Sequence, residues 1–110
     1  MLYGIERTRF VVPPLDVAAE FPHAATFYAR AVSDADTPVS YTWYHNGHRL
    51  VSDAHVYVDT VSGNLTILET DEDDLGEYKC VASNGISTDT ATAKLHLPGE
   101  IGPVLHVLNT

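Results

Sequence analysis

One cysteine, Cys80, is present among the 110 residues, so the chain cannot form an internal disulfide. A lone cysteine favours a reducing compartment or the replacement of a partner cysteine by another residue. Basic residues are also few: 6 lysines and arginines stand against 15 aspartates and glutamates, for a formal net charge of −9. Because such a surface repels phosphate groups, we expect neither nucleic acid nor an anionic membrane surface as a partner. The acidity suits either solubility or a basic protein partner.

Long apolar runs are missing as well. The longest are a few residues, such as Phe10-Val11-Val12, so no segment is expected to span a bilayer or act as a signal peptide. We interpret Met1 as the start of an excised fragment rather than of a secreted protein. On this interpretation the protein meets a membrane only through an anchor outside the fragment.

The residues that are present predict a β-sandwich. Hydrophobic residues make up 45% of the chain, which is typical of a globular protein, and the length suits one domain. Apolar residues alternate with a period of two, and turn signals recur about every ten residues, as in all-β sandwiches. The predicted strands cover residues 9–12, 15–19, 25–32, 39–44, 49–51, 56–58, 64–68, 77–83 and 90–97.

Two Asn-Gly pairs and the alternation fix the expected turns and the inward faces. Asn46-Gly47 and Asn84-Gly85 favour tight hairpin turns, because these residues accept a positive φ. We expect the following inward side chains: Phe27, Ala29, Ala31, Val39, Tyr41, Trp43, Leu65, Ile67, Tyr78, Cys80, Ala82, Ala91, Ala93, Leu95 and Leu97. Val56 and Val58 alternate through another strand.

Three motifs together resemble the intermediate-set (I-set) immunoglobulin pattern. They are Trp43 with the following Tyr44-His45-Asn46-Gly47, Gly63-Asn64-Leu65-Thr66-Ile67, and the run from Asp74 through Gly76 and Tyr78 to Cys80. The resemblance implies a two-sheet Greek-key sandwich over residues 9–97. Its implied structural core contains Ala29, Trp43, Leu65, Gly76, Tyr78 and Cys80. The Tyr78 hydroxyl should bond to the backbone of the preceding turn, and Gly76 should permit a tight backbone there.

The sequence departs from the family pattern at two positions. Ala29 stands where the second core cysteine belongs, so the expected sandwich lacks the inter-sheet disulfide. Many relatives also pair an arginine with the aspartate that matches Asp74. Here the nearby residue is His55, which puts that salt bridge in doubt.

The chain also resembles, more finely, the last immunoglobulin domain of adhesion molecules of the contactin and L1 kind. The residues concerned are the long connection 32–38, Tyr41-Thr42-Trp43 and the tail from Pro98 to Val104. The implied organisation is an N-terminal extension (1–8), the immunoglobulin domain (9–97), and a linker or the start of a fibronectin type III module (98–110). Giant muscle and cytoskeletal proteins use similar domains.

Several residues suggest chemistry that the surroundings do not support. The acidic run 69–74 lacks calcium-loop spacing and indicates a solvated corner, and the pair His45 and His48 lacks a third zinc ligand. Cys80 is expected to be a buried, unreactive thiol. No nucleophile–base pair is recognisable, so we expect neither catalysis nor a cofactor nor a metal. Asn64-Leu65-Thr66 is a glycosylation sequon whose Asn64 and Thr66 should face outward.

Two faces compete as binding surfaces. One carries Thr42, Tyr44, Lys79, Val81 and Ser83, and the opposite one carries Tyr28, Arg30, Thr66 and Leu68. The favoured hypothesis is a non-catalytic protein-interaction module of a multidomain cell-surface adhesion or receptor protein. Its contacts would be homophilic or heterophilic, with neighbouring domains at the ends of the sandwich. The alternative is an intracellular structural domain, a spacer or docking unit of a muscle or cytoskeletal protein. The sequon and the tail favour the extracellular location, whereas the lost cysteine favours the cytoplasmic one.

Overall fold

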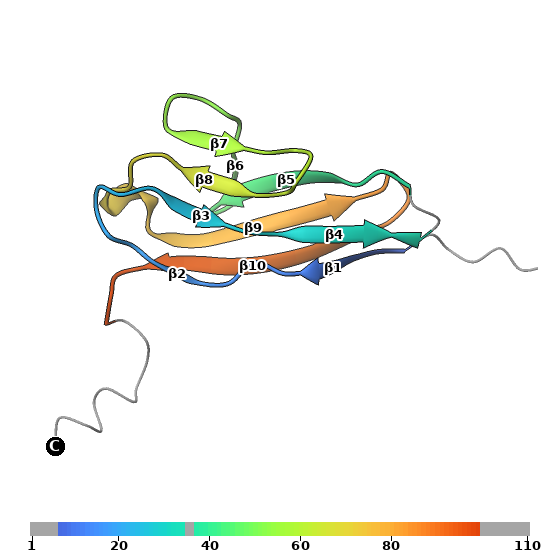
Figure 1. The fold of residues 1–110 in the computed structure, drawn as a ribbon, viewed down its shortest axis with the longest axis horizontal. Helices are drawn as coiled ribbons and strands as arrows, with labels where there is room; N and C mark the ends of the chain where they lie inside the picture. Colours follow the sequence, from blue (N-terminus) through green and yellow to red (C-terminus); the bar gives the residue numbers. More distant parts are fainter. Residues whose placement is uncertain (1–6, 35–36, 100–110) are drawn as a thin grey trace, which may run out of the picture.

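Two layers of β-strands enclose the core in the computed structural model, which describes residues 7–34 and 37–99 (Figure 1). A short 3-10 helix, Glu72–Asp74, precedes the ninth strand. The strands are β1 (Thr8–Val12), β2 (Val17–Ala18), β3 (Ala25–Phe27), β4 (Arg30–Ser33), β5 (Ser40–His45), β6 (His48–Arg49), β7 (Val56–Val58), β8 (Leu65–Ile67), β9 (Gly76–Ser83) and β10 (Thr88–His96).

One layer is the five-stranded sheet β2-β10-β9-β5-β6, and the other contains the three-stranded sheet β3-β8-β7 and the pair β1-β4. The β2–β10 pairing is parallel, and the other pairings are antiparallel. Because β3 and β4 follow each other after two residues, the β1-β4 pair continues the layer of the three-stranded sheet (Figure 1). The predicted all-β sandwich is confirmed.

The two predicted hairpin turns form at the Asn-Gly pairs. Asn46 and Gly47 have φ angles of 47° and 88°, and they connect β5 to β6 with His45 opposite His48. In the β9–β10 turn, the Asn84 side-chain carbonyl accepts hydrogen bonds from the backbone N–H groups of Ile86 and Ser87 (2.8 and 2.7 Å). Each turn therefore sets the register of the strands that it joins.

The core lies between the two layers. Trp43, Phe27, Tyr78, Leu65, Ile67 and Leu95 are its largest apolar side chains, and all are fully buried. The rings of Phe27 and Trp43 lie 5.8 Å apart, and those of Phe27 and Tyr78 lie 4.9 Å apart, both tilted. These three aromatic side chains fill the centre of the sandwich, and such pairs contribute beyond their buried area.

The structure corrects two details of the expected strands. The predicted strand 25–32 is interrupted after Phe27, where the N–H of Ala29 bonds to a side chain and not to a neighbouring strand. Leu97 was expected on the inward face of the last strand, but it is 36% exposed. The reason is that β10 ends at His96, so Leu97 lies beyond the sheet that would cover it.

Two ends of the predicted organisation fall partly outside the described residues. Thr8, assigned to the N-terminal extension, is buried in β1, and residues 1–6 are not described. Of the tail 98–110, Pro98 and Gly99 are described, and the predicted start of a further module lies outside the described part. Within the described ranges, no helix is long and apolar enough to cross a membrane.

Candidate protein-binding faces

The outer side of the five-stranded sheet holds the first predicted binding face, which we call the β5–β9 face: Thr42, Tyr44, Lys79, Val81 and Ser83. In the register of these strands Thr42 is opposite Val81, and Tyr44 is opposite Lys79. The residues between them, such as Trp43 and Cys80, are buried, so the five side chains point away from the core. The structure therefore brings all five onto one half-exposed surface.

Tyr44 and Lys79 form the centre of the β5–β9 face. The Lys79 ammonium nitrogen lies 4.8 Å from the centroid of the Tyr44 ring, which is a cation–π arrangement. Arg49 on β6 is opposite Tyr44 in the next strand pairing. Tyrosine and arginine are among the residue types enriched at interface hot spots, so Tyr44 and Arg49 make this the part of the face best suited to a protein contact.

The outer side of the other layer holds the second predicted face, which we call the β3–β8 face: Tyr28, Arg30, Thr66 and Leu68, together with Tyr57. Tyr28 is 64% exposed and Leu68 is 46% exposed, and Arg30 is also exposed. Tyr57, which the sequence reasoning left out, is 52% exposed and lies opposite Thr66 in the β7–β8 pairing. The alternation of Val56 and Val58 along this strand is the sequence signal that could have placed Tyr57 on the opposite, outer side.

The sequon lies on the β3–β8 layer. Asn64 is half-buried, and its side-chain carbonyl accepts a hydrogen bond from the N–H of Ala29 (3.1 Å). The Thr66 hydroxyl is 3.0 Å from that of Thr26. Leu65 between them is fully buried, so the two sequon side chains leave the core side as expected. Asn64 therefore has a structural contact within this layer.

Around Cys80 and Ala29, where the family's disulfide is missing, packing and one side-chain hydrogen bond hold the core together. Cys80 and Ala29 are both buried members of the core. Burial away from water raises the pKa of the Cys80 thiol to about 12, so the thiolate is scarce at neutral pH. The Trp43 indole N–H donates to the carbonyl of Gly63 (2.8 Å), which fastens the β7–β8 turn to the core.

Asp74 organises the corner before β9. The Tyr78 hydroxyl donates to its backbone carbonyl (2.5 Å), as the family resemblance implies. One carboxylate oxygen of Asp74 accepts from the Asp71 N–H (2.8 Å), and the other lies 2.6 Å from Nε2 of His55. A hydrogen-bonded pair of His55 and Asp74 thus stands where many relatives pair arginine with aspartate, and it is an ion pair when His55 is protonated. The hydrogen bond to Asp74 raises the pKa of His55, with burial opposing the shift.

Asp71 and His45 also contact the protein near this corner. Asp71 accepts from the N–H of Asp73 (2.8 Å), and with Asp74 it forms a capping box around the 3-10 helix. The His45 ring stacks on Tyr78 at 4.3 Å, with its Nε2 3.0 Å from the carbonyl oxygen of Leu75. His48 is exposed in the hairpin turn and does not share a described contact with His45 beyond the strand pairing.

The fold and these motifs define the class of the protein. The family model of the immunoglobulin I-set domain matches residues 8–97. Because this match covers most of the chain, the chain belongs to the I-set immunoglobulin family.

Individual relatives come from adhesion proteins and from other multidomain proteins. The chain is 34% identical over 92 residues to the tyrosine-protein kinase-like otk of Drosophila willistoni, which covers 80% of this chain. It is 31% identical over 106 residues, or 93% of this chain, to neural cell adhesion molecule L1 of Rattus norvegicus. The chain spans 8% of the length of each relative. Among solved structures, the twitchin kinase region of C. elegans superposes with a TM-score of 0.74 at 26% identity, covering 84% of this chain and 16% of that one.

Proposed function

We propose that this domain is a non-catalytic protein-interaction module within a multidomain cell-surface adhesion or receptor protein. The observation that supports this proposal most is the β5–β9 face, where Tyr44 and Lys79 form a cation–π pair on the outer side of the sheet. Such a surface can bind a folded partner by shape, with the tyrosine as an anchor. The likeness to L1 agrees with a role in adhesion.

The partner is a protein, bound homophilically or heterophilically, and neighbouring domains contact the two ends of the sandwich. Nucleic acid remains an unsuitable partner, because the chain has a net charge of −9. The sequon residues Asn64 and Thr66, at the surface of the β3–β8 layer, agree with an extracellular location.

A second function is supported by the lone Cys80 and by the likeness to the twitchin kinase region. In that function the domain is an intracellular spacer or docking unit of a muscle or cytoskeletal protein. A buried free thiol is compatible with a reducing compartment, because this fold does not depend on a disulfide.

The proposed function is tested with beads coated with the domain. The beads are offered to cultured cells and, separately, to beads that carry the same domain. We expect attachment, and we expect Tyr44→Ala and Lys79→Glu to reduce it roughly tenfold by removing the anchor and reversing the charge of the face. Val61→Ser is the matched control, because Val61 is exposed on the other layer in the β7–β8 turn.

Two outcomes would contradict the proposal. Attachment that Tyr44→Ala and Lys79→Glu leave unchanged would rule out the β5–β9 face. Absence of attachment to any cell surface, combined with location of the natural parent protein in the cytoplasm by fractionation, would favour the intracellular function.

A further inference from the structure

The side-chain amide of Asn64 in the sequon is bound to the protein through its oxygen only. Oδ1 accepts a hydrogen bond from the backbone N–H of Ala29 (3.1 Å), and a backbone N–H can only donate, so the orientation of the amide is fixed. Nδ2 of Asn64 has no hydrogen-bond partner among the described residues. In that part of the chain no buried side-chain nitrogen or oxygen lacks a partner, so Nδ2 is open to solvent.

An exposed aromatic ring lies beside Asn64. The antiparallel register of β3 and β8 pairs Phe27 with Leu65, so the next residues, Tyr28 and Asn64, are neighbours. Tyr28 points outward, because Phe27 and Ala29 on either side of it are buried, and it is 64% exposed. Directly opposite residues of a sheet have Cβ atoms about 4.5–5.5 Å apart. A group attached to Nδ2 therefore starts within reach of the Tyr28 ring.

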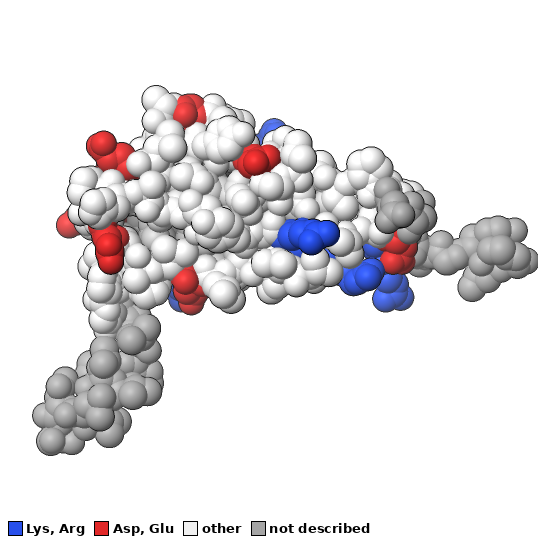
Figure 2. All heavy atoms as spheres, in the orientation of Figure 1, with Lys and Arg blue, Asp and Glu red and all other residues white. Residues whose placement is uncertain are grey.

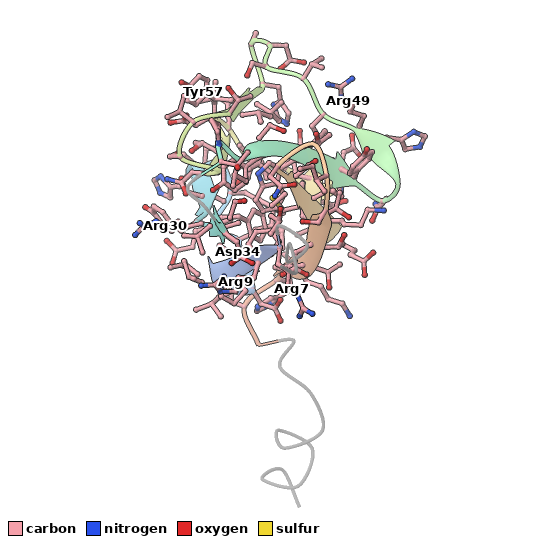
Figure 3. The ribbon with its side chains drawn as sticks, turned by 90° about the vertical axis from the view of Figure 1, so that its right-hand side faces the viewer. Arg7, Arg9, Arg30, Asp34, Arg49 and Tyr57 are labelled. Carbon is pink, nitrogen blue, oxygen red and sulfur yellow. The ribbon has the colours of Figure 1, made fainter. Side chains whose placement is uncertain are left out.

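The surface around these two residues is mostly uncharged. Figure 2 shows the β3–β8 face toward the viewer, with few charged side chains over the middle of the layer. Figure 3 shows Tyr57 and Arg30 on this side of the sandwich, with Arg49 on the other side. A neutral sugar can cover a surface of this kind while removing little charge from water.

We propose that Asn64 carries an N-linked glycan whose first N-acetylglucosamine packs on the ring of Tyr28. This inference deepens the proposed function and rests on its extracellular location. The oligosaccharide comes from a polyisoprenyl pyrophosphate donor. A bond forms between Nδ2 and C1 of the sugar, the bond from C1 to the pyrophosphate oxygen breaks, and Nδ2 gives up one proton. Oδ1 takes no part in this exchange, so it keeps the N–H of Ala29 and holds the sugar beside Tyr28.

The contact between the sugar and Tyr28 stabilises the folded state. One face of the sugar ring presents C–H groups, and these pack on the negative face of an aromatic ring. The packing also removes apolar surface of the exposed tyrosine from water. Because Asn64 and Tyr28 are neighbours only through the β3–β8 pairing, the unfolded chain gains little from the sugar.

A glycan on Asn64 also determines which face a protein partner can reach. Thr66 and Tyr57 lie opposite each other on the same outer surface, and Leu68 is exposed there, so the glycan covers the β3–β8 face. The β5–β9 face belongs to the other layer of the sandwich. The glycosylated domain therefore presents the β5–β9 face to its partner.

The domain is secreted from cultured animal cells that make only high-mannose glycans, and peptide mapping by mass spectrometry detects the glycan. An endoglycosidase then trims it to one N-acetylglucosamine, and bacterial expression supplies the form without sugar. We expect the single sugar to lower the equilibrium constant of unfolding roughly threefold in the parent and to have no effect in Tyr28→Ser. Tyr57→Ser is the matched control and should keep the threefold effect, because Tyr57 is a 52% exposed tyrosine on the same face, opposite Thr66.

An unmodified Asn64 in the secreted domain overturns this inference. So does an effect of the single sugar that Tyr28→Ser leaves unchanged, or one that Tyr57→Ser abolishes. Stronger bead attachment after trimming of the full glycan would show that the partner uses the β3–β8 face.

Attachment of coated beads separates this inference from the proposed function. Attachment that depends on Tyr44, in a domain whose Asn64 receives no sugar, would refute the glycan and leave the proposed function standing. A sugar that stabilises the domain through Tyr28, in a domain that attaches to no cell and to no second copy, would refute the proposed function and leave the glycan.

Discussion

At the scale of single residues, the partner of Asp74 is a titratable side chain, His55. Many relatives have an arginine there, which stays charged. Nε2 of His55 is 2.6 Å from the Asp74 carboxylate, with 42% of the His55 side chain exposed against 9% of Asp74. Asp74 raises the pKa of His55 above its ordinary value, and Asp71 and Asp53 act in the same direction more weakly. The charged pair therefore stabilises the fold fully below about pH 6.5, and this stabilisation is lost as the pH rises through the raised pKa.

The substitution His55→Arg should make the stability of this corner independent of pH. We expect the free energy of unfolding of the variant to exceed that of the parent at pH 8, and the two to converge near pH 5.5. An arginine stays charged across this range, whereas His55 does not. Urea unfolding at several pH values measures the difference, with His23→Arg, an exposed position, as the control for added charge. Parallel pH curves for parent and variant would contradict a role of His55 titration.

Ala29 and Cys80 offer a second test at this scale. Ala29→Cys should form a disulfide with Cys80 under oxidising conditions, because both positions are buried in the same core. In the chain-entropy model, a loop of this length contributes about 4 kcal/mol. Thermal unfolding with and without reductant measures the gain, and thiol titration reports whether the bond is present. Two free thiols in the folded, oxidised variant would show that these residues are not opposite each other.

Gly76 has a backbone conformation that other residues adopt with difficulty, and a Cβ there would displace the side chain of Asn46. Its φ is 125°, and a Cβ there would lie 2.7 Å from the side-chain oxygen of Asn46. We expect Gly76→Ala to destabilise the domain by about 1–3 kcal/mol. Gly85→Ala is the matched control, since Gly85 has a φ of 90° with nothing within 4 Å of the added Cβ. Equal losses in the two variants would assign the whole effect to the backbone conformation.

At the scale of elements, Asn64 joins two strands where their backbone ladder is interrupted. Its side-chain carbonyl takes the N–H of Ala29 between β3 and β4. Asn64→Ala leaves this buried N–H without its partner and should cost about 1–3 kcal/mol, whereas Asn64→Asp keeps an acceptor and should cost less. Chemical denaturation of both variants checks the order. Because both remove the sequon, their masses after secretion, against that of the parent, also test glycosylation.

The sequence predicts the strands well and their interruptions poorly. The alternation around Trp43 and Tyr78, and the Asn-Gly pairs, are local patterns, and local patterns determine which residues face the core. The break at Ala29 depends on a side chain 35 residues away, which alternation does not record. The pair of His55 and Asp74 likewise depends on how β7 lies beside the corner before β9, so the sequence alone left it in doubt.

The same limit applies to the candidate faces. The β5–β9 face is made by two strands whose inward residues the sequence predicts. Because side chains alternate along a strand, the residues between them must all point to the outer side. On the β3–β8 face, the alignment of Thr26, Thr66 and Tyr57 in one row depends on the register of β3 with β8 and of β7 with β8. A one-residue shift in either pairing would move the row, and register is a property of the folded sheet.

At the scale of the whole molecule, one core serves all three hydrogen-bonded sheets. Ala31 from β4, Ile67 from β8 and Cys80 from β9 belong to the same buried cluster, and Phe10 from β1 packs against it. The layers thus share their apolar contacts although the β1-β4 pair and the β3-β8-β7 sheet have separate ladders. A domain with a single core is expected to unfold in one cooperative transition.

We therefore predict that the unfolding curves followed by Trp43 fluorescence and by far-ultraviolet circular dichroism coincide. Trp43 is the one tryptophan of the chain and is fully buried, so its emission reports the core, whereas circular dichroism reports all strands. Reductant should leave both curves unchanged, because the chain has no second cysteine. A dichroism change that precedes the fluorescence change would show that β1 and β4 separate from the core first. In that case the hydrogen bond between Asn64 and Ala29 would not couple β4 to the rest of its layer.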